Sequence, residues 1–250
     1  MNTRRASLVG GAAAAVVATG LITSNPGVDG LWHSAVAAAD EPPAPSPSPA
    51  GSAPVPGVEK LIAALTIVDE LPEVSGYSRD CGRGDGCVFG TAWTDDYDGV
   101  GARNGCDTRN DVLGDQLIDV KYKPGTGDCK VLSGTLNDPY TGREIAFTSG
   151  KSTSSAVQID HIFPLARSWR AGAAHWPLGK RVAFANDIEL NLLASDGPAN
   201  QAKSDKGLDE WLPPNTAYQC TYAIKYLTVA AAYDLAITSG DAAAARTACR

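Results

Sequence analysis

Two titratable residues end a short apolar segment in the second half of the chain. Asp160 and His161 follow residues 157–159 and come shortly before Pro164, a pattern typical of a strand that a proline ends. At a strand end the backbone can turn, so the carboxylate can hold a cation while the imidazole faces a bound water. Since a neutral imidazole accepts a proton near neutral pH, the pair indicates cation-assisted hydrolysis.

Two asparagines downstream could complete this site. Residues 188–194 have the composition of a second strand, in which Asn191 interrupts an apolar run, and Asn200 lies on the helical segment that follows. If the second strand folds back on the first, Asn191 comes near His161, and Asn200 can offer its carbonyl oxygen to a metal beside Asp160. Oxygen ligands suit Mg²⁺, Mn²⁺ or Ca²⁺. Each asparagine alone is a weak signal, since turns and helix caps use this residue often.

The surrounding pattern predicts the elements that must position these residues. Apolar residues at helical spacing predict an amphipathic helix over 58–71, ended by Pro72, and a longer helix over 216–239, stopped by Gly240. Asp241 then caps a last short helix. The Gly-rich segment 76–105 has no clean period and predicts irregular structure. Strands are expected over 117–122, 129–136 and 144–148, so the fold class is α+β, with a small antiparallel sheet and packed helices.

The N-terminal part predicts export. Residues 1–22 carry Arg4 and Arg5 before an alanine-rich apolar stretch, and residues 37–39 offer a cleavage site, so we predict an export signal over 1–39. An uncleaved N-terminal anchor is the alternative. The Pro-rich segment 40–57 predicts a linker, and the folded domain is expected over 58–250. We therefore expect a secreted or cell-surface protein without stable membrane insertion after processing.

Six cysteines follow the leader. An even number in an exported chain favours disulfides, whose pairing sequence alone leaves open. Structural zinc is the competing interpretation, although the chain has no CxxC pair and three histidines. Pairing of cysteines that are close in sequence gives the hypothesis of three disulfides: Cys81 with Cys87, Cys106 with Cys129, and Cys220 with Cys249.

The motifs of the proposed site resemble a known family. The sequence 160–165 (DHIFPL), the segment 186–192, and 200–205 (NQAKSD) are similar to the HNH (ββα-metal) endonucleases. The likeness is closest to the C-terminal domain of GmrSD-type restriction endonucleases and its secreted bacterial relatives, whose pattern residues 103–113 also match. The resemblance covers roughly residues 77–222.

The resemblance implies a ββα-metal core over 151–212 and a single-metal phosphodiesterase. His161 would be the general base, Asp160 and Asn200 the metal ligands, and Asn191 the residue that orients the His161 ring. Asn200 departs from the best-known pattern, which has His at this position. The implied cofactor is a divalent metal, Mg²⁺ first and Mn²⁺ or Ca²⁺ as alternatives, and the implied substrate is DNA, with RNA as an alternative.

The net charge of −7 gives no general attraction to a polyanion, so local cations must bind the phosphates. We expect Lys203, Lys206, Arg167 and Arg170 in this role. Arg109, with its polar neighbours, could line the cleft or belong to a structural network of ion pairs.

Other classes of function fit part of the pattern. The domain could be a non-catalytic cell-surface or wall-associated binding module with a vestigial HNH-like site, and His161 a hydrogen-bonded structural histidine. The acidic net charge also fits a metal-dependent hydrolase of another substrate. The sequence leaves the oligomeric state open.

Overall fold

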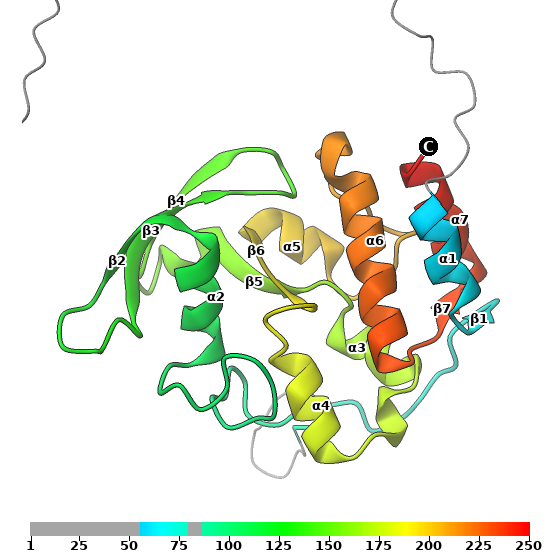
Figure 1. Cartoon of the computed structure of the whole chain (residues 1–250), viewed down its shortest axis with the longest axis horizontal. Helices are drawn as coiled ribbons and strands as arrows, with labels where there is room; N and C mark the ends of the chain where they lie inside the picture. The colour runs from blue at the N-terminus through cyan, green and yellow to red at the C-terminus, as the bar shows by residue number, and fades with distance from the viewer. Residues whose placement is uncertain (1–55, 80–86) are drawn as a thin grey trace, which may run out of the picture. The chain divides into compact units, whose positions relative to one another are not determined.

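The computed structural model describes residues 56–79 and 87–250. The predicted export signal and nearly all of the predicted linker lie outside these residues. The described chain is a mixed α+β domain with small sheets and, within these ranges, seven α-helices (Figure 1). The predicted α+β class is therefore confirmed. None of the helices in the described ranges has the length and apolarity that a membrane crossing requires.

A three-stranded antiparallel sheet lies beside helix α2 (Thr108–Gln116). Its strands are β2 (Ile118–Tyr122), β3 (Val131–Asn137) and β4 (Glu144–Thr148), in the order β2-β3-β4. The three predicted strands are thus confirmed, whereas helix α2 was not predicted from the sequence. Its N-cap Asp107 accepts a hydrogen bond from the Asn110 backbone N–H, which fixes the start of the helix.

The polar residues of interest lie on a separate pair of strands. Strand β5 (Val157–His161) pairs antiparallel with β6 (Leu192–Asp196), with His161 opposite Leu192. Helix α5 (Gly197–Lys203) follows directly, because Asp196 caps it by accepting from the Ala199 N–H. Figure 1 shows this unit between the three-stranded sheet and the C-terminal helices. Buried apolar side chains of β5 and β6 join those of the sheet and of α2 in one core, which includes Val112, Leu113, Val131, Phe147, Val157, Ile159, Leu192 and Ala194.

The predicted second strand, 188–194, is wrong in its bounds, since β6 begins at Leu192. Asp187 explains the shift. Its carboxylate accepts hydrogen bonds from the Glu189 and Leu190 N–H groups, which holds a turn where the sequence predicted extended backbone.

The remaining helices pack around a second apolar core, which includes Phe163, Phe184, Tyr222, Tyr226 and Leu227. They are α1 (Pro56–Ala63), α3 (Leu165–Arg170), α4 (Leu178–Ala185), α6 (Thr216–Tyr233) and α7 (Ser239–Ala248), and short 3-10 turns cover Ser154–Ala156 and Ala173–His175.

Two predicted helix ends need correction. Helix α1 stops at Ala63 rather than reaching Leu71, because Ile67 and Val68 form strand β1 (Ile67–Val68), parallel to β7 (Ile237–Thr238). Helix α6 ends at Tyr233, where Asp234 takes a left-handed conformation with φ of 56°.

The last helix also starts differently from the prediction. Thr238 is the N-cap of α7, and Asp241 lies inside the helix, where the two residues form a reciprocal capping box.

Two of the predicted disulfides are present. Cys106 pairs with Cys129, which ties the loop before α2 to the start of β3. Cys220 pairs with Cys249, which ties α6 to the end of α7. Cys87 is also disulfide-bonded, but its predicted partner, Cys81, lies outside the described residues. The predicted irregular segment is irregular from residue 87 to 107, as expected.

Candidate active site

Asp160 is a buried carboxylate at the end of β5 with two strong donors. Its Oδ1 accepts a hydrogen bond from the Lys203 ammonium at 2.9 Å, and its Oδ2 accepts one from the Tyr140 hydroxyl. Lys203 also donates to the His161 carbonyl oxygen at 2.8 Å, so helix α5 is fastened to the strand end. Burial raises the pKa of Asp160 and lowers the pKa of Lys203, and the attraction between the two groups opposes both shifts.

The neighbouring His161 ring is held in one orientation. Its Nε2 lies 2.9 Å from the Ala185 carbonyl oxygen, and the ring stacks on Trp93 with 5.7 Å between centroids. A carbonyl can only accept, so Nε2 carries the proton and Nδ1 keeps a free lone pair. The pKa of His161 is lowered to about 3, mainly by burial and in smaller part by the cations Arg79 and Lys203, while the hydrogen bond to Ala185 opposes the shift. The imidazole is therefore neutral at physiological pH and can accept a proton.

Both side chains line a pocket of about 530 Å³, together with Asn200, Gln158 and the exposed Arg79. The Asn200 amide Nδ2 donates to Gln158 Oε1 at 2.9 Å, which directs its nitrogen toward the strand. Among the described residues, no donor is bound to the side-chain oxygen Oδ1 of Asn200, whose backbone carbonyl accepts from the Ser204 N–H. The structure thus brings Asp160, His161 and Asn200 to one cavity, as the spacing predicted.

Asp160 and Asn200 would offer oxygens to a metal, which suits a hard divalent cation. A carboxylate has about four acceptor positions, so Asp160 keeps capacity beyond its bonds to Lys203 and Tyr140. Mg²⁺ in proteins commonly takes one or two protein oxygens and keeps several waters, which fits Asp160 and Asn200. In the described part of the chain, no group of three His, Cys, Asp or Glu residues could hold a metal, which does not favour a zinc-type cluster.

Comparison with known proteins places the chain in a family. The family model of the GmrSD restriction endonuclease C-terminal domains matches residues 107–244, more than half of the chain. The chain belongs to this family. An "uncharacterized secreted protein" of Arthroderma benhamiae is 34% identical over 203 residues, which cover 81% of this chain and 88% of the relative. No solved structure matches.

The secreted relative and the disulfides agree on location. Disulfides persist in oxidising compartments outside the cytoplasm, and the relative is described as secreted. The predicted extracellular location is therefore confirmed for this member of the GmrSD family.

Asn191 does not touch the His161 ring as predicted. Its Oδ1 accepts from the Phe163 N–H at 2.9 Å, and its Nδ2 donates to the Phe184 carbonyl oxygen. The asparagine therefore fixes the turn after His161 and links it to the end of α4. Its effect on the ring is indirect, because α4 also carries Ala185, the partner of Nε2.

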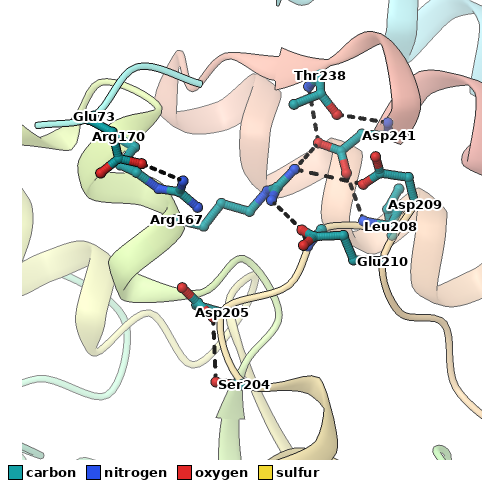
Figure 2. A network of polar contacts seen from close by, with 11 residues as sticks. Glu73, Arg167, Arg170, Ser204, Asp205, Leu208, Asp209, Glu210, Thr238 and Asp241 are labelled. Carbon is teal, nitrogen blue, oxygen red and sulfur yellow. Dashed lines mark hydrogen bonds and ion pairs between the residues drawn. The ribbon is translucent and has the colours of Figure 1, made fainter. Parts of the chain in front are cut away.

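Arg167 is not available to a substrate, which corrects the prediction of a phosphate contact. Its side chain is 4% exposed and reaches Asp241 at 2.7 Å and Glu210 at 3.0 Å, with Asp209 at 4.0 Å (Figure 2). Burial lowers the pKa of Arg167, but the interactions with Tyr226 and Asp241 outweigh it and raise this pKa above its ordinary value. Arg167 thus joins α3 to the capped start of α7, while the neighbouring Arg170 reaches Glu73 at 3.5 Å.

The other predicted phosphate contacts also have different surroundings. Lys203 is fully buried against Asp160, so it holds that carboxylate in place and is not exposed to a substrate. Lys206 donates to the Ala202 carbonyl oxygen beyond the end of α5. Arg109 donates through Nη2 to the carbonyl oxygens of Ser154 and Val157 and lines a different hollow.

Sequence reasoning missed several residues of the site in this GmrSD-family chain. Arg79, Gln158, Tyr140 and Trp93 all touch the pocket or its buried groups. Gln158 could have been found, because it shares the strand motif with Asp160 two positions away. The other three carry no local signal, since their contacts depend on distant parts of the chain.

Proposed function

We propose that the protein is a secreted, divalent-metal-dependent endonuclease that hydrolyses phosphodiester bonds in DNA, with RNA as the alternative substrate. One observation carries the proposal: a neutral His161, with Nε2 tied to the Ala185 carbonyl oxygen and Nδ1 left unprotonated, shares a cavity with Asp160 and Asn200. Membership of the GmrSD family supports a nuclease-related chemistry. The order β5, β6, α5 supports the assignment of a ββα-metal core.

In this mechanism His161 is the general base. Nδ1 takes a proton from a water molecule, whose oxygen attacks phosphorus, and the bond from phosphorus to the leaving oxygen breaks. The leaving oxygen takes up a proton from solvent. Because the Ala185 carbonyl fixes the other ring nitrogen, the ring cannot rotate away from the cavity.

Asp160 and Asn200 would hold the divalent cation, Mg²⁺ first and Mn²⁺ or Ca²⁺ as alternatives. When bound, the cation neutralises charge on the phosphate and stabilises the leaving oxygen. Lys203 and Tyr140 keep the Asp160 carboxylate oriented through their two hydrogen bonds. Arg79, exposed at the pocket wall, is suited to bind a phosphate oxygen.

Plasmid cleavage tests the proposal. Supercoiled plasmid is incubated with purified protein in Mg²⁺, Mn²⁺, Ca²⁺ or EDTA, and nicking is followed on a gel. We expect cleavage that EDTA abolishes, and a loss of at least about 100-fold in His161→Ala, because the base is gone. His175→Ala, which changes an exposed histidine at the end of a 3-10 turn, is the matched control and should cleave like the wild type.

Wild-type-like cleavage by His161→Ala would exclude this mechanism. A folded wild-type protein that cleaves nothing with any of the metals would instead favour the non-catalytic binding module.

A further inference from the structure

A second hollow, of about 450 Å³, lies close to the catalytic pocket. A narrow crevice shares lining residues with both: Arg79 and His161 line the pocket and the crevice, and Trp93 lines the crevice and the hollow. Trp93 therefore separates the proposed general base from the second hollow. A ligand that leaves the pocket past His161 meets this indole next.

The second hollow is cationic. Arg109 projects from α2, and Lys130 is exposed at the start of β3. The Arg109 Nη2 is anchored by the Ser154 and Val157 carbonyl oxygens, so the guanidinium is held in place.

Asp107, the acidic side chain that lines this hollow, is hydrogen-bonded to Asn110. Both carboxylate oxygens of Asp107 accept hydrogen bonds from Asn110, through its backbone N–H and its side-chain amide. Asp107 keeps its negative charge, because the amide donors are neutral, so Arg109 and Lys130 together leave the hollow with one net positive charge in a chain whose net charge is −7.

A third hollow, of about 460 Å³, provides a comparison. It shares Gln201 with the catalytic pocket and lies on the other side of α5, where Thr148, Ser152 and Thr153 line it. No charged side chain of the described residues lines this hollow. A polyanion that extends from the catalytic pocket is therefore attracted toward Trp93 and not toward Gln201.

We propose that the Trp93–Arg109–Lys130 hollow is a flanking-nucleotide subsite, in which a phosphate next to the scissile one binds the two cations and a base packs on the indole. The assignment rests on the proposed nuclease function and specifies the direction in which the polynucleotide crosses the molecule. Aromatic faces bind bases with little sequence preference, while guanidinium and ammonium groups bind the backbone.

Two exposed lysines allow a matched test. Lys130→Gln removes a cation from the proposed subsite, and Lys151→Gln makes the same exchange at an exposed lysine that lines none of the three hollows. Binding of a fluorescein-labelled 12-nucleotide single strand is measured by anisotropy in the His161→Ala background without metal. We expect Lys130→Gln to raise Kd about 3- to 10-fold and to reduce the slope of log affinity against log salt by about 0.7, the value for one phosphate contact. Lys151→Gln should stay within about twofold of the parent.

Equal effects of the two exchanges, or no effect of either, would overturn the subsite. Thermal unfolding of each variant excludes a loss of fold as the cause. Hydrolysis of bis(p-nitrophenyl) phosphate by the wild type tests the chemistry without any flanking nucleotide. If the wild type hydrolyses neither bis(p-nitrophenyl) phosphate nor plasmid, the proposed function is overturned. If the protein cleaves DNA but both lysine variants have the same KM for the oligonucleotide, only the subsite is overturned.

Discussion

Two buried cations of this protein, Lys203 and Arg167, have similar chemistry and different surroundings. Lys203 forms an ion pair with one carboxylate, that of Asp160, which also lines the candidate active-site pocket. Arg167 is enclosed by Asp241, Glu210 and Asp209, and neither Arg167 nor any of these carboxylates lines that pocket in the described chain (Figure 2).

The two ion pairs therefore differ in their contact with a cavity and not in residue type, which is the basis for expecting different roles. A buried carboxylate beside a cavity keeps acceptor positions that a cation or water can reach. A buried ion pair closed on all sides contributes to the stability of one packing arrangement, and removing one partner leaves an uncompensated charge.

The largest expected effect concerns the carboxylate at the cavity. Asp160→Asn keeps the size of the side chain but removes the charge that would hold the cation, so we expect plasmid cleavage to fall by about 10³-fold or more. The measurement is the initial nicking rate in Mg²⁺, with circular dichroism to confirm the fold. Nicking at the wild-type rate would remove Asp160 from the site.

Substitution in the buried ion pair of Arg167 and Asp241 should lower the stability of the protein and leave its cleavage activity unchanged. Asp241→Asn leaves Arg167 buried without its nearest carboxylate, and we expect a loss of about 3 kcal/mol in the free energy of unfolding, measured with urea. Glu210→Gln is the matched control, because that carboxylate is 53% exposed, and it should cost less than about 1 kcal/mol. Specific activity of folded Asp241→Asn at low temperature should match the wild type. Equal losses from the two exchanges would contradict the comparison.

A smaller effect should appear in the pH dependence of stability. The pKa of His161 falls from 6.5 to about 3 on folding, so the unfolded chain binds more protons between these values. Stability should therefore fall as pH falls from 6.5 toward 3. Between pH 7 and 4.5 the wild type should lose about 2 kcal/mol more than His161→Gln, as measured by urea unfolding at each pH.

His175→Gln provides the control for this titration. Its exposed ring should leave the acid sensitivity of the wild type intact. If His161→Gln is as acid-sensitive as the wild type, then the histidine is not buried in its neutral form.

Local signals explain what could be predicted from the sequence. Apolar runs and a turn sequence predict strands β2, β3 and β4, and the joint spacing of Asp160, His161 and Asn200 predicts that they meet. Strand β6 was misplaced because the side chain of Asp187 caps a turn, which an apolar pattern does not reveal. Arg167 was misassigned because its partners lie 43 and 74 positions away in the chain. The contact that orients the His161 ring was missed for the same reason, because its carbonyl partner, Ala185, lies 24 positions away in the chain.

The pairing of β1 with β7 has a consequence for engineering. Residues 67–68 lie beside residues 237–238, and Glu59 of α1 meets Arg246 of α7 at 2.8 Å, so the beginning and the end of the described domain are neighbours (Figure 1). A short peptide could connect Arg250 to Pro56, and new termini could be opened at the exposed Gly125 between β2 and β3. Such a circular permutant would present both termini on the small sheet, far in sequence from the residues that fasten the two ends together.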